Sequence, residues 1–399
     1  MDKGGIIVNK TNLIFLHKFF KAIANSIIQV FIPLYILKVT GSLMLAMVYL
    51  TIYTCFVMFF IFVLRKFIQK FGVLAIMLHF IPIIVTEALI SFCTIDFGIV
   101  FLCAFFMGIS QGLYSVPINL IFAFSDKHTN VAKFQIPSNI GKLSFVLISG
   151  FVLSSTIENN FLIMSVLSIV FYVLSVIPIM YAYKMLKEHY QEKVQLVHQP
   201  TKTPLYKNFK WFHVGFGCFQ ACMDNCIPLY LYVNNLSFQA VTIVIALIEL
   251  LKIFANYFAK YLVGKGKQKL CCMVGCVVYF VSLLGLMLFR IPELLYVFSC
   301  LSAVSFPLTF VPMFKMYCNY LSSTNNVFDG LVYRDLDIFS VRPIMYALAF
   351  MGVGLWPCLV VGLVSTVSML ASEICVMKQK SVEDNIFNVV VEGENKWKQ

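Results

Sequence analysis

Long apolar stretches, separated by short polar connections, follow one another through almost the whole chain. A helix needs about 20 mainly apolar residues to cross the roughly 30 Å of hydrocarbon in a bilayer, and twelve stretches come close to that length. We therefore expect an all-α membrane protein with twelve transmembrane helices. The expected spans are residues 13–37, 43–64, 73–93, 97–123, 138–156, 160–183, 209–233, 238–259, 270–289, 293–317, 338–354 and 356–377.

The second half of this pattern repeats the first half. The tetrapeptide Ile-Pro-Leu-Tyr occupies residues 32–35 and again residues 227–230. A cation follows each copy at the same distance, since Arg65 and Lys260 both lie 33 residues after the Ile. A parallel repeat of this kind predicts two six-helix bundles related by an axis along the membrane normal.

A polar segment separates the two halves. Residues 184–208 contain five lysines and two prolines, and proline interrupts helices. At the end of the chain, a polar stretch of mixed charge favours a segment without a fixed structure. We therefore divide the chain into an N-terminal six-helix bundle (1–183), a cytoplasmic linker (184–208), a C-terminal six-helix bundle (209–380) and a flexible cytoplasmic tail (381–399).

Positive charges lie in alternate connections. Cytoplasmic connections of membrane proteins are rich in Lys and Arg. Here the even-numbered connections hold most cations, whereas the odd-numbered ones hold little beyond Lys38 and Arg290. This predicts a multi-pass protein of the plasma membrane with both termini in the cytoplasm. The cations of the even-numbered connections are Arg65, Lys66, Lys70, Lys127, Lys133, Lys260, Lys265, Lys267, Lys269 and Arg334, together with the lysines of the linker.

Composition agrees with this interpretation and excludes other classes of protein. Apolar residues make up 60% of the chain and charged residues 12%, which a water-soluble globule of this length could not accommodate. The net charge of +12 follows from the cationic connections, so it predicts no nucleic-acid partner. The 13 cysteines lie mostly in apolar stretches and lack the paired spacing of metal sites, so we expect reduced thiols and neither a metal nor a cofactor.

Polar side chains inside the spans are candidates for a binding site. Asn25 and Gln29 share one face of span 1, and the repeat aligns them with Gln220 and Asp224 of span 7. Placing a charged side chain at the centre of a membrane helix costs about 2.5–3.5 kcal/mol, so Asp224 should face the protein interior. For the amides, hydrogen bonding between helices without a role in binding is the alternative.

Span 8 carries a charged pair that the first half lacks. Glu249, Lys252 and Asn256 follow one another at steps of three and four residues, whereas the matching positions 54, 57 and 61 of span 2 hold no charge. Because the first copy packs without these charges, we interpret the pair as binding substrate or a coupling ion. A purely structural ion pair is the alternative, because the two charges neutralise each other on one helix face.

Spans 4 and 10 contain prolines beside polar side chains. Gln111 and Asn119 lie on one face of span 4 around Pro117, and span 10 contains Pro307 and Pro312 among serines and threonines. A proline in a membrane helix frees backbone carbonyls, which favours a cavity at this level. A simple bend of the helix is the alternative.

Twelve spans in a six-plus-six repeat, with a long basic central connection, resemble the major facilitator superfamily over nearly the whole chain before the tail. Its motif after span 2, Gly-x-x-x-Asp-Arg-x-Gly, aligns with residues 65–72. Lys70 and Gly72 match the basic and last glycine positions, but Arg65 replaces the first glycine and Gln69 replaces the aspartate. The resemblance implies that spans 1, 4, 7 and 10 surround a central cavity.

Cations near the cytoplasmic ends of the spans are candidates for gating contacts. We expect Lys142 and Arg342 at the inner ends of spans 5 and 11, where they would close an inner gate or contact the carbonyl ends of neighbouring helices. The gating candidates are Arg65, Lys70, Gly72, Lys142, Arg334 and Arg342. The candidates for binding or coupling are Asn25, Gln29, Gln111, Asn119, Gln220, Asp224, Glu249, Lys252 and Asn256.

Together these features predict a secondary active transporter rather than an enzyme. The chain has no nucleophile elbow, zinc-protease motif or ATP-binding phosphate loop, so an ion gradient is the expected driving force. We expect a monomer in which two bundles give alternating access to a midplane site for a small solute, coupled to protons carried by Asp224 or Glu249. The alternative is a membrane sensor or lipid-handling protein that keeps this fold without transport, which the altered motif after span 2 would favour.

Overall fold

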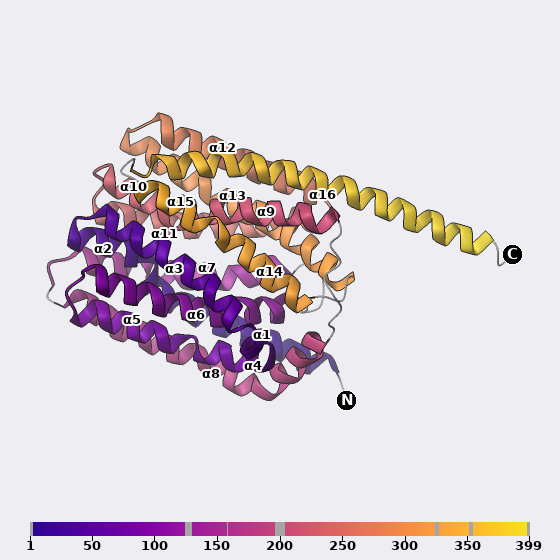
Figure 1. The fold of residues 1–399 in the computed structure, drawn as a ribbon, viewed down its shortest axis with the longest axis horizontal. Coiled ribbons are helices and arrows are strands. Elements are labelled where there is room, and N and C mark those ends of the chain that lie inside the picture. Colours follow the sequence, from indigo (N-terminus) through magenta and orange to yellow (C-terminus); the bar gives the residue numbers. More distant parts are fainter. Residues whose placement is uncertain are drawn as a thin grey trace.

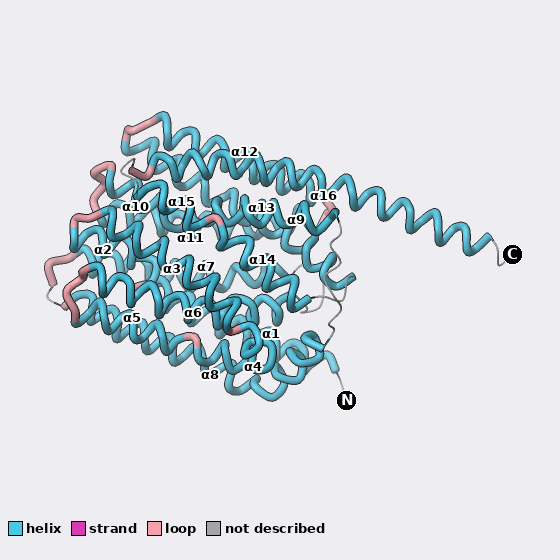
Figure 2. The backbone as a smooth tube through the Cα atoms, in the orientation of Figure 1, coloured by secondary structure: helices cyan, strands magenta, loops and turns pink. Residues whose placement is uncertain are grey.

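The computed structural model describes residues 3–123, 130–157, 159–195, 204–323, 327–350 and 354–396. Within these ranges every regular element is a helix, which confirms the predicted all-α class. The helices lie side by side in one bundle (Figure 1), and many of the loops that connect them gather at one end of it (Figure 2). Lys127 and residues 196–203 of the expected linker lie outside the described residues.

The two halves of the chain occupy different parts of the bundle. In Figure 1 the first half, coloured indigo to magenta, lies below, and most of the second half, coloured pink through orange to yellow, lies above. The first half contains α1 (Lys3–Ile27), η1 (Gln29–Phe31), α2 (Ile32–Thr40), α3 (Leu43–Val63), α4 (Arg65–Leu78), α5 (Phe80–Phe92), α6 (Phe97–Ala123), α7 (Asn130–Ser154) and α8 (Asn160–Gln195). The second half contains α9 (Pro204–Ala221), η2 (Cys222–Cys226), α10 (Ile227–Val233), α11 (Phe238–Gly264), α12 (Gln268–Leu288), α13 (Pro292–Ser323), α14 (Val327–Ser340), α15 (Arg342–Leu348) and α16 (Trp356–Lys396).

Nine helical stretches among the described residues are long and apolar enough to cross a membrane, or ten if the bent pair α4–α5 forms one span. Expected spans 7 and 11 correspond to shorter pieces, α9–η2–α10 and α14–α15. Each of these spans is interrupted close to a proline, Pro228 or Pro343, which is the second residue of the next helix. The count of twelve spans and the arrangement of the repeat therefore stay predictions.

The bend between α4 and α5 measures 43° and has a local cause. Pro82 has no N–H to bond to the carbonyl of Leu78, so the ladder of helical hydrogen bonds is broken at this point. The Nδ1 of His79 lies 2.6 Å from the carbonyl oxygen of Ile76, one turn before the carbonyl groups at the bend. Expected span 3 is thus bent at His79, six residues after its expected start.

Spans 1 and 7 are interrupted at corresponding places. A 3-10 turn, η1, precedes α2, and a π turn, η2, precedes α10, and both short helices have a proline in their first turn, Pro33 and Pro228. The next helices, α3 and α11, both begin after a capping serine: Ser42 and Ser237 each accept a hydrogen bond from a backbone N–H three residues later. Irregular turns in membrane helices frequently occur at functional sites.

The two halves pack closely where α7 meets α11. Gly150 on α7 has no side chain, and a Cβ added there would lie 2.1 Å from the Cγ2 of Thr242 on α11. Glycine therefore permits a close approach of the two helices that a larger residue would prevent. Near the same end of the bundle, the rings of Phe31 and Phe238 stack with their centres 5.8 Å apart.

Two helices extend beyond their expected ends. Helix α8 continues to Gln195, well into the expected linker, and the buried hydroxyl of Tyr190 donates to the carbonyl of Ile68 over 2.8 Å. Helix α16 continues to Lys396, through the segment expected to be a flexible tail, and projects from the bundle (Figure 1). Residues 381–396 contain no proline, so nothing in their backbone interrupts the helix. Helix α1 begins and α16 ends on the same side of the bundle (Figure 1).

Candidate functional site

A cavity of about 400 Å³ lies between the two halves. Helices α1, α3, α6 and α7 line it from one half, and α9, α11, α13 and α14 from the other. The segments η1 and η2 and the short helices α2, α10 and α15 also contribute, whereas no described residue of α5, α8, α12 or α16 does. The sequence-predicted candidates that line the cavity are Asn25, Gln29, Gln111, Asn119, Lys142, Gln220, Asp224, Glu249, Lys252, Arg334 and Arg342.

Four charged side chains form a chain of ion pairs in this cavity. The Nζ of Lys252 lies 2.9 Å from Oε1 of Glu249 and 3.6 Å from Oδ1 of Asp224. The same Glu249 oxygen lies 3.6 Å from the Nζ of Lys142, which belongs to the other half of the molecule. The pair on α11 is therefore no isolated couple, because each member has a second partner of opposite charge.

Burial differs along this chain of charges. The side chains of Glu249 and Lys252 are both only 6% exposed, whereas those of Lys142 and Asp224 are 26% and 36% exposed. The two central groups depend on each other and on their outer partners, because a buried charge without a partner is very costly. The two outer groups remain accessible to water or to a solute in the cavity.

Arg342 brings to the cavity a positive charge whose hydrogen-bond partner is neutral. Its Nη2 donates to Oε1 of Gln220 over 2.7 Å, and its guanidinium lies 4.2 Å from the centre of the Phe339 ring. Its Nε is buried without a hydrogen-bond partner among the described residues. Arg334, by contrast, is paired with Asp335 at 3.0 Å. Arg342 can therefore offer a guanidinium to an anionic group that enters the cavity.

Lys142 and Arg342 do not lie where we expected them. Instead of ending their helices on the cytoplasmic side, both line the cavity. Helix α7 begins at Asn130, so Lys142 lies about 18 Å along the helix. Arg342 begins α15 only after the 14 residues of α14, which precede most of the expected span. Because α14 carries acidic and basic side chains, the sequence analysis took it for a polar connection between spans.

Four candidates do not line the cavity: Asn256, Arg65, Lys70 and Gly72. The Nδ2 of Asn256 donates to the backbone carbonyl of residue 252, one turn earlier on α11, over 2.8 Å. The other three belong to α4, whose first residue joins the two halves through an ion pair between Arg65 and Asp329. Only Arg65 among them makes a contact between the halves of the kind that a gate requires.

The prolines of spans 4 and 10 have different surroundings. Pro117 lies inside α6, and the polar residues 115 and 119 on either side of it line the cavity. On α13 the hydroxyls of Ser302 and Thr309 donate to carbonyls of their own helix, over 2.7 and 3.0 Å. That helix lines the cavity with Phe306 and Phe310 instead.

A polar face of α7 escaped the sequence analysis. Gln135, Ser138 and Asn139 line the cavity together with Lys142. Their spacing of i, i+3, i+4 and i+7 places them on one side of a helix. Periodicity could have found them, but the expected span began only at residue 138 and cut this face in two.

A second group of buried polar side chains lies within the first half, next to the cavity. The Nε2 of His17 lies 3.2 Å from the hydroxyl of Tyr114, and the Nζ of Lys21 lies 3.7 Å from the centre of the Tyr114 ring. Tyr172 donates to Oδ1 of Asn25 over 2.6 Å. Asn25 thus connects the cavity lining to the interior of its own bundle.

Sequence comparison decides the family. A sequence model of the Major Facilitator Superfamily matches residues 14–328. The chain belongs to this superfamily. The predicted family is therefore confirmed, and membership identifies the chain as a multi-pass membrane transporter rather than an enzyme. A comparison with curated proteins finds no match.

Solved structures of superfamily transporters have a similar fold. A bacterial homologue of the iron transporter ferroportin, in its outward-facing state, gives a TM-score of 0.67 at 12% identity and covers 94% of this chain and 99% of its own. A POT family transporter in complex with a thioalcohol-conjugated peptide gives 0.64 at 12% identity, covering 92% and 96%. The E. coli fucose:proton symporter FucP gives 0.57 at 9% identity, covering 92% and 98%. At such low identities the likeness establishes the superfamily fold alone.

Proposed function

We propose that this superfamily member is a secondary active transporter for a small solute with an anionic group. Two bundles of six spans each would give the cavity alternating access to the two sides of the plasma membrane, with both termini in the cytoplasm. The observation that carries the proposal is Arg342, whose guanidinium lies in a cavity between the halves with the neutral Gln220 as its hydrogen-bond partner.

The rest of the lining supports a small polar solute. A volume of about 400 Å³ falls within the usual range of small-molecule pockets. Amide groups both donate and accept hydrogen bonds, so they suit solutes with hydroxyl, amide or amino groups. The amides of the lining are Asn25, Gln29, Gln111, Asn119, Gln135, Asn139, Gln220 and Asn225.

The chain of ion pairs supports coupling to protons. Lys142 and Glu249 lie on opposite halves, 3.6 Å apart. A proton on Glu249 would remove its charge and weaken this attraction, which would make separation of α7 and α11 easier. Asp224 is the second proton carrier that we propose, because it is the more exposed acid and pairs with Lys252. Proton binding would thereby favour a different arrangement of the two bundles.

A thermal-shift screen of the purified protein tests the choice of solute. We expect solutes with a carboxylate or phosphate to stabilise the wild type, and their neutral analogues to do so much less. Arg342→Gln should lose this difference, whereas Arg290→Gln, which removes an exposed cation outside the cavity, should keep it.

Transport of the solutes found in this way is then measured in proteoliposomes. Accumulation driven by an imposed proton gradient is the expected result. Neutral solutes that bind the wild type and Arg342→Gln equally well would contradict the anionic substrate. Tight binding without any flux would instead favour the sensor or lipid-handling alternative.

A further inference from the structure

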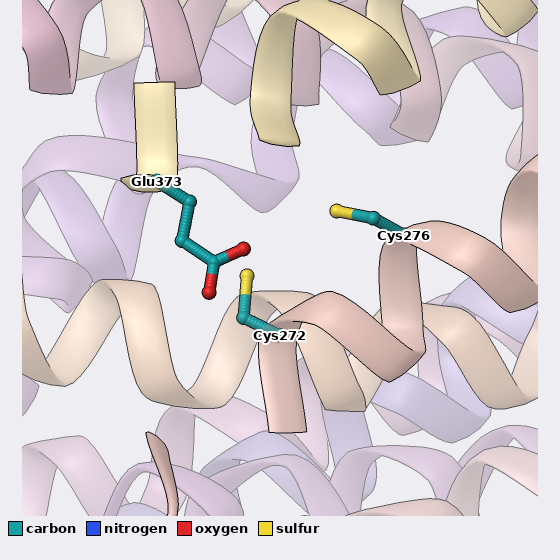
Figure 3. Close-up of side chains that lie close together, drawn as sticks. All are labelled: Cys272, Cys276 and Glu373. Atoms are coloured by element: carbon teal, nitrogen blue, oxygen red, sulfur yellow. The ribbon is translucent and has the colours of Figure 1, made fainter. Parts of the chain in front are cut away.

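Two thiols and a carboxylate meet between α12 and α16, away from the cavity. The ligand atoms of Cys272, Cys276 and Glu373 all lie within 4.8 Å of one another. All three residues are buried, with exposed fractions of 0%, 1% and 0%. The cysteines are four residues apart on α12, so both thiols leave the same face of this helix, and the Glu373 carboxylate points toward them from α16 (Figure 3).

The carboxylate of Glu373 lacks the partners that a buried carboxylate normally has. Neither of its oxygens has a nitrogen or oxygen hydrogen-bond partner among the described residues. The group beside them is the thiol of Cys272 (Figure 3). Buried carboxylates are costly unless they are paired or coordinate a metal ion, so this arrangement needs an explanation.

Backbone packing brings the three groups together. Gly362 on α16 packs against α12, since a Cβ added there would lie 3.0 Å from the Cδ1 of Leu283. From this contact Glu373 lies 11 residues further along α16, and Cys272 lies 11 residues back along α12. The antiparallel register of two helices therefore aligns the carboxylate with the thiols.

We propose that Cys272, Cys276 and Glu373 bind a thiophilic divalent cation of the zinc class. Two sulfurs and a carboxylate oxygen are ligands that Zn²⁺ prefers, whereas Mg²⁺ and Ca²⁺ prefer oxygen ligands only. With Zn–S bonds of about 2.3 Å, two thiolates of a tetrahedral site lie about 3.8 Å apart, so small side-chain rotations suffice here. A water molecule completes the fourth position.

Charge and access are compatible with this site. Metal binding releases the thiol protons to water, which leaves two thiolates, one carboxylate and one divalent cation with a net charge of −1. Lys269, exposed in the first turn of α12, interacts electrostatically with Glu373 and offsets this charge. Cys272 lies four residues into α12, about 6 Å along the helix from its first residue, so the site lies close to one end of this helix.

The bound metal ties α16 to α12 within the second half. None of its three ligands lines the cavity, so the site is separate from the solute that we propose for transport. The cysteine spacing alone predicted no metal site, because the third ligand follows 97 residues after Cys276 and only the fold brings it near.

Cobalt substitution of the purified full-length protein tests this proposal. After removal of metals with a chelator, addition of Co²⁺ should produce the visible bands of a tetrahedral ion and a sulfur-to-metal charge-transfer band, saturating at one equivalent. Zn²⁺ should displace both signals. Cys272→Ser, Cys276→Ser and Glu373→Gln should each weaken Zn²⁺ binding at least about tenfold, because even loss of an outer-shell partner costs about 10–100-fold.

Cys271→Ser is the matched control. Cys271 is equally buried and adjacent in sequence, but its thiol donates to the carbonyl of Leu308 over 3.4 Å. The control should bind Zn²⁺ like the wild type, and so should Arg342→Gln, which separates this test from that of the transported solute.

Three results would overturn the proposal. The first is a wild type without stoichiometric thiolate–cobalt bands. In that case Glu373 would be a neutral carboxyl group that is hydrogen-bonded to a thiol. The second is a signal that survives Cys272→Ser and Cys276→Ser but disappears in Cys226→Ser, which would assign it to the thiols of η2. The third result concerns the wild type alone and is decisive even if a ligand variant fails to fold. Chelation should lower the unfolding temperature of the wild type, and added Zn²⁺ should restore it. An unfolding temperature that does not change would reject the site.

Discussion

Arg65 and Asp329 are 264 residues apart in sequence, yet the Nη2 of Arg65 lies 2.5 Å from Oδ1 of Asp329. Arg65 begins α4 directly after span 2, and Asp329 lies in the first turn of α14, where a negative charge also interacts favourably with the helix dipole. The ion pair joins the two halves at the start of α4, the helix that contains the residues aligned with the superfamily motif. An arginine in place of the motif's first glycine thus makes a contact between the bundles.

Asp329→Asn should favour opening of the cavity on the side where this ion pair lies, without unfolding the transporter. The Arg65 side chain is 36% exposed, so the ion pair contributes only about 0–1 kcal/mol. That is enough to change the ratio of two conformations by up to about fivefold. A cysteine introduced at Ser138 in the cavity should therefore react faster with a thiol reagent supplied from the cytoplasmic side.

Two further variants control this measurement. Glu188→Gln removes an exposed carboxylate of α8 and should leave the labelling rate unchanged. Exchange of the two charges, Arg65→Asp with Asp329→Arg, should restore the slow labelling of the wild type. Equal labelling in Asp329→Asn and the wild type would show that the pair does not hold the bundles together.

Gly72→Ala should destabilise the first half. A Cβ at position 72 would lie 2.1 Å from Cζ of Tyr190, whose hydroxyl is held by the carbonyl of Ile68. Overpacking of this kind costs about 1–3 kcal/mol, which thermal unfolding in detergent would detect. Gly264→Ala is the matched control in the second half, because nothing lies within 4 Å of its added Cβ.

A double variant separates the clash from other causes. When Tyr190→Ala is combined with Gly72→Ala, the ring that clashes is gone. The double variant should therefore lose clearly less free energy of unfolding than the sum of the losses in the two single variants. If the two losses of free energy of unfolding simply add, the destabilisation by Gly72→Ala has another cause, for example in the backbone of α4.

Membrane topology is tested with single introduced cysteines. The exposed native Cys55, Cys93 and Cys375 are first replaced by serine, so that they do not contribute to labelling. Cysteines at positions 159 and 235 should then react with a membrane-impermeant reagent from outside the cell, and those at 193 and 385 only after the membrane is opened. The bias of cations toward the even-numbered connections is the reason for this orientation. Labelling of position 193 from outside would contradict the six-plus-six arrangement.

Polar positions that line the cavity could be predicted from the sequence wherever a polar side chain interrupts a strongly apolar helix. Asn25, Gln111 and Asp224 lie in such helices, and lipid is so unfavourable for them that only the protein interior remains. Helix α14 could not be predicted in this way. Its cavity-lining side chains, Arg334 and Asp335 among them, make the helix look like a cytoplasmic connection when only apolar length is considered.

Ion pairs between the two halves could not be predicted from the sequence at all. Lys142 and Glu249 are 107 residues apart, and nothing in their local sequence relates them. They meet because α7 and α11 pack closely, which depends on the absence of a side chain at Gly150. Sequence analysis identified the charges correctly but paired Glu249 only with Lys252, its neighbour on the same helix.

The last prediction concerns this chain of charges. Lys252→Met removes the cation between Glu249 and Asp224 and leaves the buried Glu249 with one partner fewer. Removal of one member of a buried ion pair typically costs about 3–5 kcal/mol, so this variant should be strongly destabilised. Glu249→Gln combined with Lys252→Met removes opposite charges together and leaves only the more exposed Lys142 and Asp224. Its unfolding temperature should lie much closer to that of the wild type.

Stability and transport should therefore separate in the double variant. It folds but lacks the attraction between Lys142 and Glu249 that joins the halves, so accumulation driven by a proton gradient should be lost. Asp224→Asn keeps the shape of the side chain without its titration, and should lose accumulation while keeping exchange of solute across the membrane. Glu293→Gln, an exposed acid at the start of α13, is the control and should transport normally. Wild-type accumulation in both test variants would remove the proton-coupling hypothesis and leave these charges with a purely structural role between helices.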